Sequence, residues 1–310
     1  MVPTDPEPAG GTAMNRPVLA AIDTPERSGA AAHWAAAEAL RRGAPLRLLH
    51  AWPNSGNGDQ LLLADLREAA RRMLDGLADE LRAAHPGVEV ATSVVAGAAV
   101  DALLRAATEC ELLVLGTRGL GGFHGLLVGS VSLSTVGRCD TPVVLVRAEM
   151  PPNPRAAQHA VPRDAVPEVV VGLDPQVPAG PVLDFAFEEA ARRGAPVHVV
   201  HGWETPPTYN YGYAAGWVPS QEDRRLLETL ATRLVSDALA PWREKYPQVL
   251  VVEDVRAGGA AGALVDAAGE AALFVVGRRD RSLGVGPRLG PVAHAVIHHA
   301  PAPVAVVPHA

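Results

Sequence analysis

The sequence has few aromatic residues, few cysteines and no long apolar runs. Aromatic residues make up only 4% of the 310 residues, whereas apolar residues reach 48% and charged residues 20%. This balance is typical of a soluble globular protein, here with a core built mainly from Ala, Val and Leu. Two cysteines in so long a chain do not suggest a disulfide framework. The apolar runs fall far short of the roughly 20 residues that span a bilayer.

The amino terminus and the net charge argue against two further classes of protein, secreted proteins and nucleic-acid binders. Residues 1–15 lack the basic region and the apolar core of a secretory signal, and we expect a disordered tail there. A cytoplasmic location is therefore the expectation. The net charge of −7 argues against a dedicated nucleic-acid binder, which would present a basic face. We expect neither nucleic acid nor a membrane as a partner.

The chain contains two copies of one pattern. EALRRGAPLRLLHAW (38–52) matches EAARRGAPVHVVHGW (189–203), and ECELLVLGTR (109–118) matches EAALFVVGRR (270–279). Asp23 and Asp174 are 151 positions apart, and the offset grows to 161 between Gly97 and Gly258. The intervening segment 149–166 is rich in proline and has no apolar period, as in a linker. We therefore predict two domains, over 16–148 and 167–310.

Each copy alternates short Val- and Leu-rich strands with helices. Such alternation predicts an α/β fold of two tandem doubly wound domains, each a five-stranded parallel sheet flanked by helices on both faces. In the first copy we expect strands at 17–23, 45–52, 88–97, 111–116 and 142–147, and helices at 28–43, 63–84, 99–110 and 131–140. Ligands of open α/β sheets bind beyond the carboxyl ends of the strands.

A glycine-rich segment, GTRGLGGFHGLLVGSVS (116–132), follows the fourth strand of the first copy and leads into a helix. Glycine lets the backbone approach a ligand closely, and successive N–H groups can form an anion-binding nest. The helix start and the hydroxyls of Ser130 and Ser132 also favour an anion. The segment has neither a Walker lysine nor the GxGxxG order of dinucleotide folds. Composition alone leaves two interpretations, a phosphate-binding loop and a plain connection.

The spacing Gly116-x2-Gly119-x9-Gly129-Ser130, with Asp23 after the first strand, resembles the ATP-binding class of the universal stress protein family. AIDTPERSGAAAHWAAAEA and TPVVLVR support the resemblance, which covers nearly the whole chain as a tandem two-domain member. It implies strand order 3-2-1-4-5 in each domain, with ATP at the ends of strands one and four. It also implies domains paired through their fifth strands as an intramolecular pseudo-dimer, with a homodimer as a further option.

The resemblance also implies ligand contacts in the first copy. Asp23 would lie against the adenosine, Ala51 would contact adenine through its backbone, and Gly97 would border the adenine or ribose. ATP, with Mg²⁺ as an option, is the expected ligand, and no catalytic residue or protein metal site is predicted. The full set of predicted contacts is Ile22, Asp23, Ala51, Gly97, Gly116, Arg118, Gly119, Gly129, Ser130, Val131 and Ser132.

The second copy departs from this pattern. Asp280 stands in the place of Gly119, and Pro291 replaces Ser130. Proline has no N–H for a phosphate, although it suits the first position of a helix. Asp280 would repel phosphates unless a cation or a nearby arginine compensates. We predict weaker, different or absent binding, with Asp174, Gly202, Gly258, Gly277, Arg278 and Gly290 as the candidate contacts.

These features predict an ATP-binding regulatory or stress-response protein, in which the nucleotide modulates domain or partner association. The absence of paired carboxylates, of a Walker B aspartate and of a lysine near the loop argues against fast hydrolysis. A slow ATPase or an adenylate-using enzyme is one alternative. A ligand-free interaction module, above all in the second copy, is another. His50 and His201 are expected to pack or to form hydrogen bonds rather than to catalyse.

Overall fold

A computed structural model describes residues 15–52, 60–117, 128–147, 167–204, 220–267, 271–279 and 289–309. The predicted linker and nearly all of the predicted tail lie outside these residues. The first half of the chain contains β1 (Val18–Ala21), α1 (Pro25–Arg42), β2 (Leu46–Trp52), α2 (Gln60–Ala84), β3 (Val90–Ala96), α3 (Ala99–Ala107), β4 (Leu112–Thr117), α4 (Ser130–Val136) and β5 (Val143–Arg147).

The second half repeats the order of the first. It contains β6 (Glu168–Gly172), α5 (Gly180–Arg193), β7 (Val197–Trp203), α7 (Gln221–Lys245), β8 (Val251–Ala257), α8 (Ala260–Asp266), β9 (Ala271–Arg279), α9 (Pro291–His299) and β10 (Val304–His309). Four helix boundaries in the first half differ from the prediction by about one turn, and two of these are the start of α2, at Gln60 rather than 63, and the end of α4, at Val136 rather than 140. Helix α1 begins at Pro25, one turn before the expected start, because proline is well suited to the first helical turn. Helix α3 ends at Ala107 instead of Cys110.

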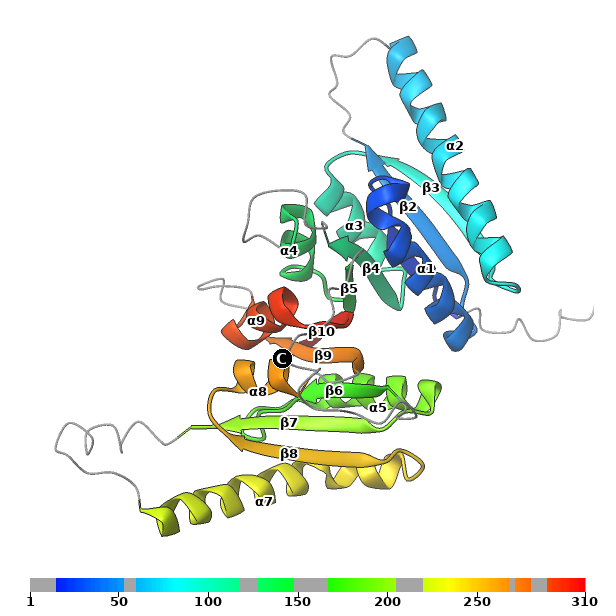
Figure 1. The fold of residues 1–310 in the computed structure, drawn as a ribbon. Helices are drawn as coiled ribbons and strands as arrows, with labels where there is room; N and C mark the ends of the chain where they lie inside the picture. The colour runs from blue at the N-terminus through cyan, green and yellow to red at the C-terminus, as the bar shows by residue number, and fades with distance from the viewer. Residues whose placement is uncertain are drawn as a thin grey trace, which may run out of the picture.

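All ten strands form one sheet, in the order β3-β2-β1-β4-β5-β10-β9-β6-β7-β8. Each half therefore has the predicted order 3-2-1-4-5, with parallel pairing inside the half. The halves meet through β5 and β10, which pair antiparallel with Val143 opposite Val306. Figure 1 shows the two strands at the centre of the molecule, with one half on each side. The expected pairing through the fifth strands is confirmed.

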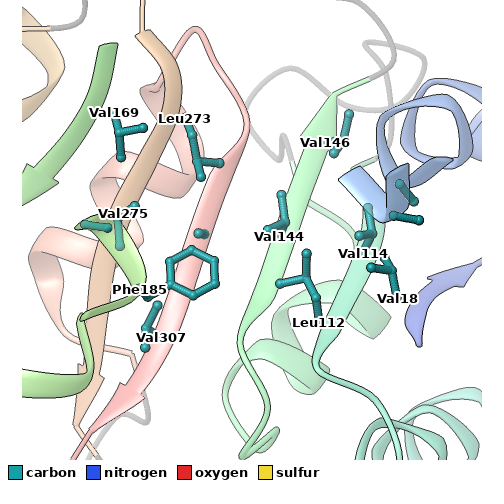
Figure 2. Close-up of a cluster of buried hydrophobic side chains, with 14 of the residues drawn as sticks. Val18, Leu112, Val114, Val144, Val146, Val169, Phe185, Leu273, Val275 and Val307 are labelled. Carbon is teal, nitrogen blue, oxygen red and sulfur yellow. The ribbon is translucent and has the colours of Figure 1, made fainter. Parts of the chain in front are cut away.

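Alternating side chains along the inner strands bury against helices on opposite faces of the sheet, whereas the edge strands β3 and β8 have no fully buried residue. Val18 and Ala20 belong to the core under α1, α2, α5 and α7, whereas Leu19 belongs to the core under α3, α4, α8 and α9. Figure 2 shows part of the first core, with Val114 and Val144 of one half and Val275 and Val307 of the other. Both faces are buried, which explains the nearly continuous apolar strands.

The repeated EALRRGAP and EAARRGAP segments meet where α1 and α5 approach each other. Arg42 donates hydrogen bonds to Glu38 and Glu189, and Arg193 donates to both carboxylates at 2.7 and 2.8 Å. Neither glutamate is exposed. Arg193 also lies over the ring of Trp34 in the other half, and Arg42 lies over Phe185. Each half thus places an arginine against the helix of its partner half.

The two glutamates occupy equivalent positions but differ in proton affinity. Burial raises the pKa of both carboxyls. For Glu38, the charges of Arg193 and Arg42 and its hydrogen bonds outweigh burial and lower the pKa to about 2. For Glu189, burial and the negative charge of Glu38 prevail, and the pKa is raised. A proton in this network therefore binds more readily at Glu189.

Candidate functional site

A cavity of about 220 Å³ lies at the carboxyl ends of β1 and β4 in the first half. Eight residues predicted as ligand contacts line it together, from four separate parts of the chain. They are Ile22, Asp23, Ala51, Gly116, Gly129, Ser130, Val131 and Ser132. Gly97 is not among the lining residues of this cavity, and Arg118 and Gly119 lie outside the described residues.

Eight further lining residues were not predicted from the sequence. They are Ala21, Arg27, Ser28, Leu49, Ala99, Leu103, Leu115 and Thr117. Arg27 and Ser28 reach the cavity because α1 begins a turn early, and the signal for this was Pro25 after Thr24. Leu49 on β2, Leu115 on β4 and Leu103 on α3 belong to the core under α3 and α4, so the apolar periods of strand and helix were the signal for the apolar part. The cavity therefore has an apolar side and a polar side.

The loop after β1 is held by two hydrogen bonds. His50 at the end of β2 donates from Nδ1 to the carbonyl oxygen of Ile22, at 2.8 Å. The backbone N–H of Asp23 donates to Oγ of the buried Ser28, at 3.0 Å. His201 makes the equivalent bond to Leu173 in the second half, at 2.9 Å. Both histidines thus have the hydrogen-bonding role expected for them.

Gly116 lies between the first turn of α1 and the first turn of α4. A Cβ atom at this position would be 3.1 Å from the carbonyl oxygen of Arg27. On the other side, Oγ of Ser132 donates to the carbonyl oxygen of Gly116 at 3.1 Å. The absence of a side chain at Gly116 therefore allows α1 to approach the end of β4 closely.

Thr117 places a hydroxyl in the cavity wall without a partner. Thr117 is 3% exposed, and its Oγ1 atom has no hydrogen bond within the described structure. A buried hydroxyl without a partner is costly, and such groups often mark a place where a ligand or water binds. Thr117 thus combines a place in the cavity lining with a buried hydroxyl that lacks a partner.

Asp23 and Arg27 are the charged residues among the described lining. Arg27 Nη1 lies 3.3 Å from Asp23 Oδ2, and the two side chains are 61% and 65% exposed. Exposed pairs of this kind contribute about 0–1 kcal/mol to stability. Both groups therefore remain accessible to a ligand at the mouth of the cavity.

In the second half, helix α8 lies against the strand positions that correspond to Ala21 and Ala51. Gly172 stands where the first half has Ala21, and a Cβ atom there would be 2.7 Å from Cδ1 of Leu264. Gly202 stands where the first half has Ala51, and a Cβ atom there would be 2.6 Å from Cα of Ala260. Helix α8 therefore packs directly on the backbone of β6 and β7.

The other candidate contacts of the second half have structural partners. Asp174 accepts a hydrogen bond from the N–H of Gln176 at 3.1 Å. Gly277 faces His309, whose Nε2 would lie 2.7 Å from a Cβ atom. Gly290 precedes α9, and Pro291 occupies the first helical position as its chemistry favours. Asp280 and Arg281 lie outside the described residues.

Arg278 extends into the first half rather than toward the second crevice. It is 4% exposed and donates to the carbonyl oxygen of Cys139 at 2.7 Å, beyond the end of α4. This contact argues against a role for its guanidinium in nucleotide binding.

Gly97 and Gly258 form equivalent tight turns after β3 and β8. Their φ values are 131° and 127°, a region that residues with side chains rarely adopt. The N–H of Gly97 donates a hydrogen bond to the carbonyl oxygen of Trp52, and that of Gly258 to the carbonyl oxygen of Trp203, both at 2.9 Å. These contacts explain the two glycines through turn geometry, independent of a ligand.

Other reactive groups lie apart from the cavity lining. Burial raises the pKa of Cys110 and of Cys139, which keeps both thiols protonated. Within the described part of the chain, no three His, Cys, Asp or Glu side chains form a group that could hold a metal ion. Among the same residues, no helix is both long and apolar enough to cross a membrane.

The sequence profile of the universal stress protein family matches residues 14–147 and again residues 167–308. The chain belongs to this family. Its two matches are the tandem domains, hereafter the first and second universal stress protein domains.

This chain is similar to individual proteins and solved structures. A universal stress protein of Mycolicibacterium smegmatis is 30% identical over 305 residues, covering 94% of this chain and 96% of that protein. The crystal structure of a universal stress protein from Archaeoglobus fulgidus DSM 4304 covers 96% of this chain and 99% of its own, with a TM-score of 0.68 and 19% identity. A universal stress protein in complex with cAMP covers 44% of this chain and 99% of its own, at 27% identity and a TM-score of 0.36.

Proposed function

We propose that this universal stress protein binds an adenine nucleotide, ATP, in the crevice of its first domain, and that binding regulates domain or partner association. The observation that carries the proposal is the cavity at the ends of β1 and β4. It brings Asp23, Gly116 and Ser130 together with the unpartnered hydroxyl of Thr117. The apolar side, with Leu49 and Leu103, suits a planar base.

The size and chemistry of the cavity fit the nucleoside part of the ligand. Its volume of about 220 Å³ lies below the roughly 300 Å³ at which ordinary ligand pockets begin. The base and ribose therefore occupy the cavity, and the phosphates extend toward Gly129 and Ser130. Mg²⁺ would accompany the phosphates, since magnesium is commonly held by one or two carboxylates together with substrate phosphates. Asp23 is the carboxylate available among the described lining.

The second domain is proposed as an interaction module that binds no nucleotide. Helix α8 packs against Gly172 and Gly202, the positions at which Ala21 and Ala51 of the first domain border a cavity. Its contribution is to pair with the first domain through β10 and Arg278.

Titration calorimetry of the full chain with Mg·ATP tests both statements. We expect one ATP per chain, weakened at least about tenfold by Asp23→Ala. Asp174→Ala, the equivalent change in the second domain, is the matched control and should leave binding unchanged. No binding by the unaltered protein would overturn the proposed function, and two equal tight sites would overturn the role given to the second domain.

The same proteins separate regulation from catalysis. We expect slow or no release of phosphate, because the described lining offers a single carboxylate and no second acid–base group. Turnover of many ATP per minute, lost in Asp23→Ala, would instead establish an ATPase.

A further inference from the structure

Arg27 is the one cationic side chain among the described residues that line the cavity. With Asp23 it forms a pair of zero formal charge, whereas the phosphates of a nucleotide carry several negative charges. A site that holds those phosphates is more favourable with a cation close to them. Arg27 is the candidate within the described lining, and no motif in the sequence pointed to it.

The position of Arg27 is at the polar side of the cavity. Its backbone carbonyl oxygen would be 3.1 Å from a Cβ atom of Gly116. Ser132 holds the carbonyl oxygen of the same glycine from α4. The backbone of Arg27 therefore lies beside the end of β4, and its guanidinium lies beside Asp23, while Leu49 and Leu103 line the apolar side.

The present partner of Arg27 is easily exchanged. Its guanidinium lies 3.3 Å from the carboxylate of Asp23, and both side chains are more than half exposed. An exposed pair of this kind is weak, so replacing the carboxylate by a phosphate costs little. The planar guanidinium also matches phosphate oxygens with two parallel N–H donors.

We propose that Arg27 contacts the phosphates of the bound nucleotide and makes the site select phosphorylated nucleotides over adenosine. This inference rests on the proposed nucleotide binding and adds the selectivity of the site. The second domain has Pro178 at the equivalent position, and α5 begins only at Gly180. That domain therefore lacks both the arginine and the helical turn that carries it.

Binding of three ligands to two proteins tests the inference. Adenosine, AMP and Mg·ATP are titrated into the full chain and into the Arg27→Gln variant by calorimetry. We expect the variant to bind ATP about tenfold more weakly, because one charge-assisted contact is lost. Adenosine affinity should stay within about twofold, since it has no phosphate. Raising the salt concentration should weaken ATP binding more in the unaltered protein than in the variant.

Two further variants serve as controls. Arg138→Gln removes another partly exposed arginine, which pairs with Asp101 outside the cavity lining, and should leave all three affinities unchanged. Arg27→Lys keeps the positive charge and should recover part of the ATP affinity. The unfolding temperature of Arg27→Gln should match that of the unaltered protein, because the side chain is exposed.

The outcomes separate this inference from the proposed function. Unchanged ATP affinity in Arg27→Gln would overturn the inference and leave nucleotide binding intact. Equal losses for adenosine and ATP would also overturn it, because they would show a structural role for the side chain. An unaltered protein that binds neither adenosine nor ATP would overturn the proposed function and this inference together.

Discussion

The two domains have the same strand order, but helix packing at the ends of their strands differs. In the first, Ala21 and Ala51 border a cavity of about 220 Å³ under α3. In the second, Gly172 and Gly202 take their places, and α8 packs against the strand backbone. Two missing methyl groups thus accompany a closer approach of the helix to the strands. The comparison teaches that the floor of the crevice, and not only the glycine-rich loop above it, distinguishes the domains.

A second difference concerns the residue that follows the glycine of the fourth strand. Thr117 in the first domain keeps an unpartnered hydroxyl at the cavity. Its equivalent, Arg278, is buried against the carbonyl oxygen of Cys139 in the other domain. The first position lines the cavity, whereas the second contacts the other domain.

The largest expected effect is a loss of stability when the equivalent glutamates between the domains, Glu38 and Glu189, are replaced. Glu38→Gln should lower the free energy of unfolding by about 3 kcal/mol or more. The change removes the buried negative charge with which Arg42 and Arg193 pair. Glu189→Gln should cost clearly less, because the raised pKa brings this carboxyl closer to a neutral group. Urea denaturation of both variants measures the difference, and equal losses would contradict the assigned pKa order.

Gly202→Ala tests the packing of α8. The new methyl group would meet backbone atoms at 2.6–2.8 Å, so we expect a loss of about 2 kcal/mol in the free energy of unfolding. Ala51→Gly is the matched change in the first domain and should cost about 0.5–1 kcal/mol, through backbone entropy. Thermal and urea unfolding provide the measurement. A neutral Gly202→Ala would show that α8 does not press on β7.

Thr117→Val should have opposite effects on stability and on binding. Removing a buried hydroxyl without a partner should raise the free energy of unfolding of the ligand-free protein by about 1 kcal/mol. ATP affinity should fall several-fold if the hydroxyl contacts the ligand. Unfolding and calorimetric binding of the same preparation test both effects, and unchanged affinity would remove Thr117 from the site.

The smallest effect is a pH dependence confined to the second domain. His198 contacts Glu168 at 2.8 Å and Asp254 at 3.2 Å. Burial lowers the pKa of His198, but these acids outweigh it and raise the pKa overall. The resulting stabilisation is complete below about pH 6.5, the unfolded value, and is lost as the pH rises through the higher folded pKa.

The equivalent residue in the first domain is Arg47, which pairs with Glu109 and stays charged. The difference in unfolding free energy between the unaltered protein and His198→Gln should therefore shrink as the pH rises from about 6 to about 9. Arg47→Gln should show a difference that does not change over this range. A constant difference for His198→Gln would refute the assigned protonation.

Much of the fold was predictable from the sequence because the repeat and the strand–helix alternation are regular. The strand order and the pairing of β5 with β10 came from the family resemblance, since periodicity does not specify neighbours. The site was predictable where glycines and serines mark close backbone approach. Arg27 and Ser28 were missed because helix starts are poorly defined by apolar periodicity. The position of α8 depends on packing between Gly202 and Ala260, which are distant along the chain.

The antiparallel contact of β5 with β10 has a consequence for evolution and assembly. A pair of separate subunits joined at this edge would dissociate on dilution, whereas two domains on one chain meet at a fixed effective concentration. The second domain therefore remains a permanent neighbour of the first at any protein concentration. Under that condition it can lose a ligand and keep its place, covering the sheet edge that its partner would otherwise expose to other chains.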